Sequence, residues 1–75
     1  MNKSQREILN QAIASIVKSR DLVDQLKFNE EFSYGNIPEN LLDSERARTM
    51  EDAIDTFDDA IDKLNDLIED LQKFA

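Results

Sequence analysis

Apolar residues recur at helical spacing in the first third of the chain. They follow a heptad repeat, whose first core position holds Leu9, Ile16 and Val23. The second core position holds Ala12, Ser19 and Leu26, and the two are flanked by Ile8, Ile13 and Leu22. Such a repeat is typical of an amphipathic helix, and Ser4 to Glu7 has the form of a capping box that would start it. The sequence therefore predicts a first helix at about residues 4–30.

A second repeat runs through the last third of the chain without a break. Its first core position holds Ala47, Ile54, Ile61, Ile68 and Ala75, and its second holds Met50, Phe57, Leu64 and Leu71. A third apolar position follows the same period, with Ala53, Ala60, Leu67 and Phe74. Either Asp43 or Ser44 can cap the start. We expect a second helix at about residues 44–74, packed in a left-handed, coiled-coil-like manner.

Residues 31–43 interrupt both repeats and contain the only Gly and the only Pro, Gly35 and Pro38. Gly35-Asn36 can adopt positive φ at low cost, which predicts the chain reversal there. Asn36 to Glu39 has the form of a second cap, and a short helical turn is expected at 38–42. The apolar residues nearby are expected to plug the end of the hairpin, or else to line a functional pocket: Phe28, Phe32, Tyr34, Ile37, Leu41 and Leu42.

The two predicted helices are similar in length, ~40 and ~46 Å at ~1.5 Å per residue, and a short connector joins them. This predicts an all-α antiparallel hairpin in a single domain, residues 1–75. The predicted core seam consists of Leu9, Ile13, Ile16, Val23, Leu26, Met50, Ile54, Phe57, Ile61, Leu64, Ile68 and Leu71.

The apolar stripe on each helix is wider than a two-stranded coiled coil requires. Packing one helix on the other should leave some side chains partly bare, among Ile8, Ile13, Leu22, Leu67 and Phe74. A chain this short also gains little stability from its own core. We therefore expect two hairpins to form a homodimeric four-helix bundle. A larger homo-oligomer, a different protein as partner, and a monomer are the alternatives.

The acidity of the chain is confined to the second predicted helix. The formal net charge is −8, and residues 51–70 alone hold nine acids and one base, Lys63. One side of that helix carries a row of carboxylates, Asp55, Asp59, Asp62, Asp66 and Asp70. Direct binding to nucleic acid or to an anionic membrane is disfavoured by this charge. A solvated helix face is the plain interpretation. The alternative is an acidic inhibitor, which would resemble DNA in its charge spacing and occupy the basic surface of a host protein, or would lend a helix to a partner's bundle.

Several kinds of chemistry are excluded by composition. The chain has no His and no Cys, so it cannot form a disulfide, a thiol metal site or a His-based catalytic triad. The run Asp55 to Asp59 superficially resembles a calcium loop, but it lacks the glycine of such a loop and lies within a predicted helix. We expect no enzymatic activity, no cofactor and no metal. No signal peptide and no membrane span are predicted, and a cytoplasmic location is the expectation.

One segment resembles a known group of proteins. Asn36-Ile37-Pro38-Glu39-Asn40-Leu41-Leu42-Asp43-Ser44-Glu45-Arg46, followed by Met50-Glu51-Asp52-Ala53-Ile54-Asp55, is similar to a pattern in small uncharacterised proteins encoded by bacteriophages and prophages. The resemblance covers about residues 36–70. It implies a helical hairpin, a phage or mobile-element accessory protein and, with that, the host cytoplasm as its location. It implies no activity and no site residues.

Overall fold

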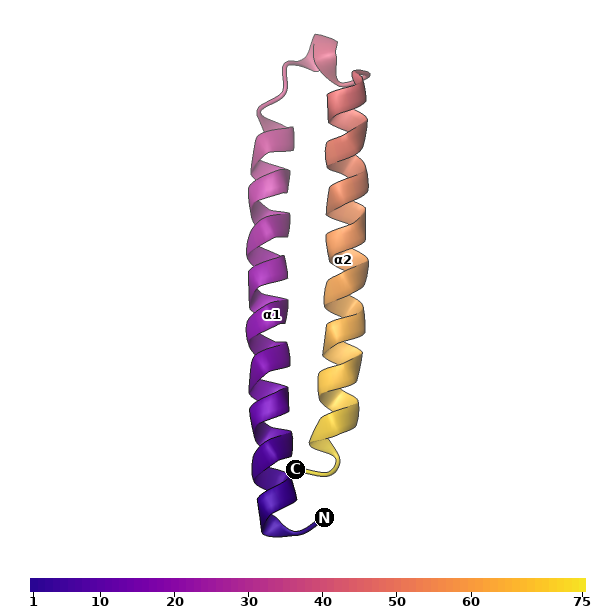
Figure 1. The fold of residues 1–75 in the computed structure, drawn as a ribbon. Coiled ribbons are helices and arrows are strands. Elements are labelled where there is room, and N and C mark those ends of the chain that lie inside the picture. The colour runs from indigo at the N-terminus through magenta and orange to yellow at the C-terminus, as the bar shows by residue number, and fades with distance from the viewer.

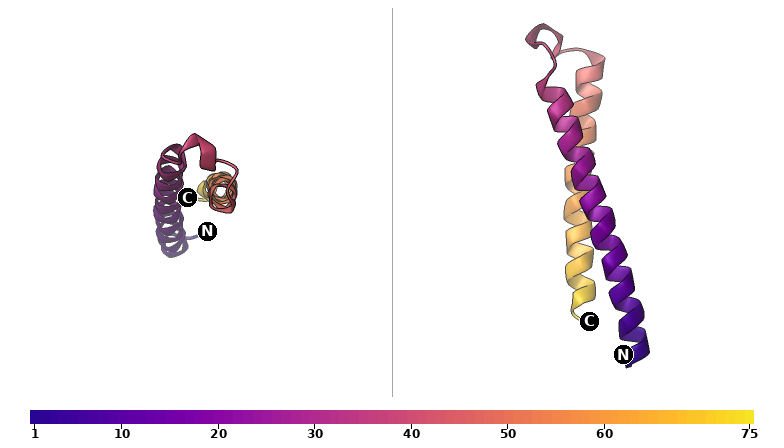
Figure 2. Two further views of the ribbon diagram at one scale, coloured as in Figure 1. Left: turned by 90° about the horizontal axis from the view of Figure 1, so that it is seen from above. Right: turned by 90° about the vertical axis from the view of Figure 1, so that its left-hand side faces the viewer.

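The protein is a hairpin of two long antiparallel helices in a computed structural model that describes all residues from 1 to 75. Helix α1 spans Lys3–Gly35, a 3₁₀ turn η1 spans Glu39–Leu41, and α2 spans Glu45–Gln72. Both termini lie at the end opposite the turn (Figure 1), and the molecule measures 60 × 15 × 13 Å. The helices cross at a shallow angle (Figure 2). The predicted all-α hairpin is thus confirmed.

The start of α1 differs from the prediction. Asn2 is the N-cap, and its side-chain oxygen accepts a hydrogen bond of 2.8 Å from the Gln5 backbone N–H. Ser4 lies inside the helix, so the predicted capping box at Ser4 to Glu7 is wrong. Asn caps a helix at least as well as Ser, and nothing between Asn2 and Ser4 stops the first turn from forming earlier.

The other end of α1 lies beyond the predicted boundary at residue 30. The helix continues to Gly35, and no residue of the chain adopts positive φ. The Asn36 backbone N–H donates to the Ser33 carbonyl, and its side chain donates to the Phe32 carbonyl at 3.0 Å. Residues 31–34 contain no helix breaker, and a single glycine at a helix end costs too little to end it sooner.

The connector is therefore residues 36–44. The short helical turn predicted there is confirmed as η1, although Pro38 is its N-cap residue and no side chain caps it. Ser44 caps α2 as one of the two predicted candidates, since its hydroxyl accepts a 3.2 Å hydrogen bond from the Ala47 N–H.

The predicted plug at the turn is largely wrong. Because α1 stays helical through residues 28–32, Phe28 and Phe32 lie one turn apart on its outer surface and are 69% and 67% exposed. Leu41 and Leu42 are exposed as well. Of the residues of the predicted plug, only Tyr34 and Ile37 are half-buried.

The core seam on α2 follows the predicted heptad. Ala47 and Ile68 are buried, and the remaining core positions are half-buried: Met50, Ile54, Phe57, Ile61, Leu64 and Leu71. The first and the second core position of the repeat thus both face α1 along the length of the helix, as coiled-coil packing requires.

The seam on α1 is turned relative to the prediction. Ile13 is buried, and Leu9, Ile16 and Val23 are half-buried, as predicted. Leu26 is 50% exposed, and the residues one and two heptads before it, Ser19 and Ala12, are exposed too, so their assignment to the second core position is wrong. In each case the next residue in sequence lies in the seam instead. These residues belong to the heptad of Ile13, Arg20, Lys27 and Tyr34.

The isolated hairpin has very little interior. Only Ile13, Ala47 and Ile68 of the 75 residues are buried. Ile13 was assigned both to the core seam and to the residues that could be left partly bare, and its burial supports the first assignment. Ile8, Leu22, Leu67 and Phe74 are exposed as expected. Neither helix contains a stretch that is long and apolar enough to cross a membrane.

Candidate interaction surface

Three hydrogen bonds join the helices along one flank of the hairpin. Arg20 Nη1 donates to Asn65 Oδ1 at 3.0 Å, and Lys27 Nζ donates to Asp58 Oδ1 at 2.8 Å. The third is donated by the Tyr34 hydroxyl to Glu51 Oε1. The donors advance by seven residues along α1 while the acceptors step back by seven along α2, as antiparallel heptads require. We call this flank, with its three donors and three acceptors, the polar edge.

The sequence analysis missed the polar edge, although its spacing is visible in the chain. Arg20, Lys27 and Tyr34 continue the heptad of Ile13, and the three acceptors also lie seven residues apart. Long side chains of this kind can pack their aliphatic or aromatic parts on the seam and place the polar group at its margin. The cation of Lys27 and the hydroxyl of Tyr34 thereby close this flank with polar groups.

The same contacts stabilise the protonated forms of two donors. The hydrogen bond to Asp58 raises the pKa of Lys27 above its ordinary 10.5, with the nearby carboxylates adding to the effect. The hydrogen bond to Glu51 raises the pKa of Tyr34 above its ordinary 10.0, and partial burial acts in the same direction. Both groups therefore contribute stability that is complete below their ordinary pKa values and is lost as pH rises through the raised ones.

We accordingly expect the hairpin to lose stability under alkaline conditions above about pH 10. Tyr34 is the only tyrosine, so the ultraviolet absorbance of tyrosinate reports its ionisation directly. The apparent pKa in the folded parent should exceed that of Glu51→Gln, whose amide lacks the charge. Superimposable titration curves for parent and variant would contradict the Tyr34–Glu51 contact.

The opposite flank of the hairpin carries exposed apolar side chains from both helices. On α2, the third apolar position of the heptad lies on the other side of the seam from Glu51, Asp58 and Asn65. On α1, a second stripe with alternating steps of four and three residues runs beside the seam, through Ile8, Ala12, Ser15, Ser19, Leu22 and Leu26. We call this flank the apolar side, and it is formed by the half-buried Ala60 together with five exposed residues, Ile8, Leu22, Leu26, Leu67 and Phe74. Its five large members are between 43% and 65% exposed.

The acidic row lies on the outer face of α2, away from the seam. Asp55, Asp59, Asp62, Asp66 and Asp70 are all exposed. Helical spacing places Thr49, Thr56 and Lys63 between the apolar side and most of this row, so that only Asp70 borders the apolar side closely. The Asp70 carboxylate is 3.4 Å from Lys73 Nζ. The apolar side is therefore nearly free of carboxylates.

The acidic row should make the protein more stable in salt. Carboxylates three and four residues apart repel by a few tenths of a kcal/mol each, and the three ion pairs of the chain are surface pairs of the kind that contributes ~0–1 kcal/mol. Added salt therefore stabilises the protein by screening the repulsion among the carboxylates more than it destabilises the protein by screening the three ion pairs. We expect the melting temperature to rise between low and moderate sodium chloride, and to rise less in Asp59→Asn/Asp62→Asn. A melting temperature that falls over this range would contradict the expectation.

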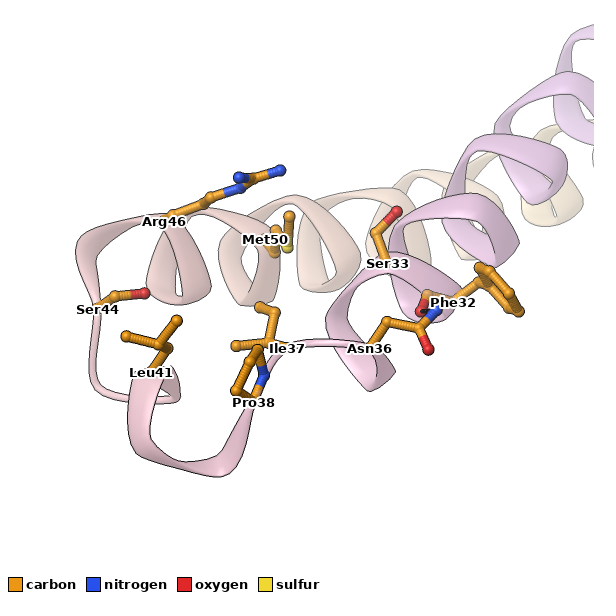
Figure 3. Close-up of a pocket in the computed structure, with 9 residues that line it drawn as sticks. All are labelled: Phe32, Ser33, Asn36, Ile37, Pro38, Leu41, Ser44, Arg46 and Met50. Carbon is orange, nitrogen blue, oxygen red and sulfur yellow. Dashed lines mark hydrogen bonds between the residues drawn. The ribbon is translucent and has the colours of Figure 1, made fainter.

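A shallow hollow of about 380 Å³ lies at the turn (Figure 3). Ile37 and Leu41 face the start of α2 there, while the Phe32 ring points away from them and Arg46 extends along the outside of α2. The remaining residues that line it are Ser33, Asn36, Pro38, Ser44 and Met50. The hollow brings together no acid–base pair or nucleophile with a base beside it. No group of three or more potential metal ligands occurs in the chain.

Comparison of the chain with models of known protein families, with curated proteins and with solved structures finds no match. The apolar side, the polar edge and the acidic row are thus the features from which a function has to be argued.

Proposed function

We propose that this protein is a non-enzymatic interaction module that works by contact with another polypeptide, and that its first partner is a second copy of itself. The observation that carries the proposal is the contrast between three buried residues and the five large exposed residues of the apolar side. Each large side chain on that flank gains on the order of 1.5–3 kcal/mol when it is fully removed from water. A four-helix bundle of two hairpins provides that burial.

The accessible surface supports association as well. The hairpin exposes 5824 Å², whereas a compact monomer of 8.7 kDa is expected to expose about 4,700 Å². The excess of roughly 1,100 Å² is close to the ~800 Å² that each partner contributes to a stable protein interface. The exposed area is therefore of the size that one partner could cover.

The test is the mass of the purified protein in solution. Sedimentation equilibrium or light scattering at micromolar concentration should give twice the 8.7 kDa of one chain, with thermal stability that increases with protein concentration. A folded species of one chain at these concentrations would refute the proposal. A folded species larger than a dimer would support self-association but would show that the stoichiometry is not two.

The proposal assigns no reaction, cofactor or metal to the chain, which has no His and no Cys. A role as an accessory protein of a phage or mobile element, acting in the cytoplasm of the host, is supported by the resemblance of residues 36–70.

The acidic row favours a second candidate, an inhibitor that binds a basic surface of a host nucleic-acid-binding or defence protein. Its five aspartates are exposed, and only Asp70 has an ion-pair partner. Capture of host proteins by the parent and by Asp59→Asn/Asp62→Asn/Asp66→Asn would test it, because electrostatic competition needs those charges. Equal capture by parent and variant would refute this candidate and leave the first intact.

A further inference from the structure

We infer that the second copy packs face to face on the apolar side with the turns of both hairpins at the same end, so that α1 of each copy lies against α2 of the other. The inference rests on the proposed self-association and adds to it the interface, the orientation and the axis. In this arrangement the two-fold axis runs parallel to the helices, and α2 and its symmetry mate occupy opposite corners of the bundle.

Of the two flanks of the hairpin, only one suits a partner. The polar edge closes the other flank with three hydrogen-bonded pairs, and covering them would remove the ion pair of Lys27 and Asp58 from water at a cost. The outer face of α2 carries the acidic row. The apolar side has neither obstacle, and it draws residues from both helices, as a bundle interface does.

The sizes of the side chains along the apolar side favour contact between α1 of one copy and α2 of the other. The polar edge sets Lys27 level with Asp58 and Arg20 level with Asn65. In the same register, to within about one residue, Leu26 is level with Ala60, Ser19 with Leu67, and Ala12 with Phe74. Each of these three layers thus presents a large side chain on one helix and a small one on the other. When α1 lies against α2 of the second copy at the same level, large meets small in all three layers, which is how close-packed cores interdigitate.

The unequal charges of the two helices favour the orientation with both turns at the same end. Helix α1 carries five acids and five bases, whereas α2 carries ten acids and three bases, a net charge of −7. Turning one copy end over end would instead stack α2 directly on α2 of the partner. With the turns together, each acidic α2 has a neutral α1 on both sides, and like charges are kept on the diagonal.

The orientation is measured with spin labels, since the chain has no cysteine of its own to remove. Asn40→Cys places a label on η1 at the turn. In the inferred dimer the two labels share one end of a bundle whose neighbouring helices are ~8–10 Å apart, so their separation should be on the order of the bundle's width. Turned end over end, they would be separated by a distance approaching the 60 Å length of the molecule. Asp62→Cys, at mid-length, should give a short separation in either orientation and serves as the control for labelling.

The interface is tested with a matched pair of substitutions on α1. Leu26→Asp should weaken dimerisation by roughly two orders of magnitude or more, because each dimer would bury two unpaired carboxylates. Phe28→Asp makes a similar change at an exposed outer position and should leave the dissociation constant nearly unchanged, with helicity followed by circular dichroism in both. A monomeric parent would refute the proposed function itself. A dimer with distant Asn40 labels would refute only the orientation, and a dimer insensitive to Leu26→Asp would refute only the interface.

Discussion

Replacing Phe57 by Asp should unfold the hairpin under conditions in which the parent is folded. Phe57 is a half-buried core position at mid-length of α2. The substitution removes an aromatic side chain and leaves an unpaired carboxylate in its place, at an expected cost of about 3 kcal/mol or more. A chain of this size has about that much stability in total. Circular dichroism during chemical denaturation, at matched protein concentration, measures the loss.

The control for Phe57→Asp is Phe28→Asp, the same chemical change at a position 69% exposed on α1. Surface substitutions of this kind usually alter the free energy of unfolding by ~0.5 kcal/mol or less. If Phe57→Asp were as helical and as stable as the parent, the heptad register of α2 would have to be abandoned.

The second large effect is expected for Ile68→Ala. Ile68 is 6% exposed and is one of only three buried residues, so its truncation removes apolar contacts near the open end of the hairpin. Core truncations of Ile to Ala cost ~2–5 kcal/mol, and the thin core of this hairpin argues for the lower part of that range. The midpoint of denaturation should fall accordingly, with little change in its slope.

Phe28→Ala is the matched truncation at an exposed site, and it should leave the midpoint nearly unchanged or raise it slightly, since Ala is the better helix former. If Ile68→Ala and Phe28→Ala had equal effects, the burial of Ile68 would not be a source of stability, and the seam would have to lie on another face of α2.

The fold class and the second helix could be predicted from the sequence because one signal dominates there. On α2 a single stripe of large apolar residues has acids opposite to it, so only one face can pack on a neighbour. Ile54, Phe57 and Ile61 are accordingly half-buried in the seam as predicted. Ser44 was one of two possible caps, and the distinction between them depended on geometry that a sequence pattern does not contain.

The face of the first helix that packs on α2 was harder to predict because two adjacent stripes of residues follow the heptad period. One stripe contains Ile13 and then the polar residues of the polar edge, and the other contains Ile8, Leu22 and Leu26. Hydrophobicity alone favours Leu26 over Lys27 as a core residue, yet Lys27 lies in the seam because Asp58 on α2 accepts a hydrogen bond from it. A contact between residues 31 positions apart becomes visible only when both helices are placed. Ile8, Leu22, Leu67 and Phe74 are exposed as the sequence predicts. That they lie on one flank of the hairpin becomes visible only when both helices are placed, since they belong to two different helices.

The polar edge also bears on how long this hairpin can be. Its donors and acceptors both repeat every seven residues, so a displacement of α1 along α2 by one heptad, ~10.5 Å, would set Arg20 opposite Asp58 and Lys27 opposite Glu51. A base would again face an acid at each of these two levels. The polar edge therefore restricts the helices to whole-heptad settings, and the connector of residues 36–44 selects among them. Insertions or deletions in the connector should consequently change the overlap of the helices in steps of one heptad, each of which keeps bases opposite acids.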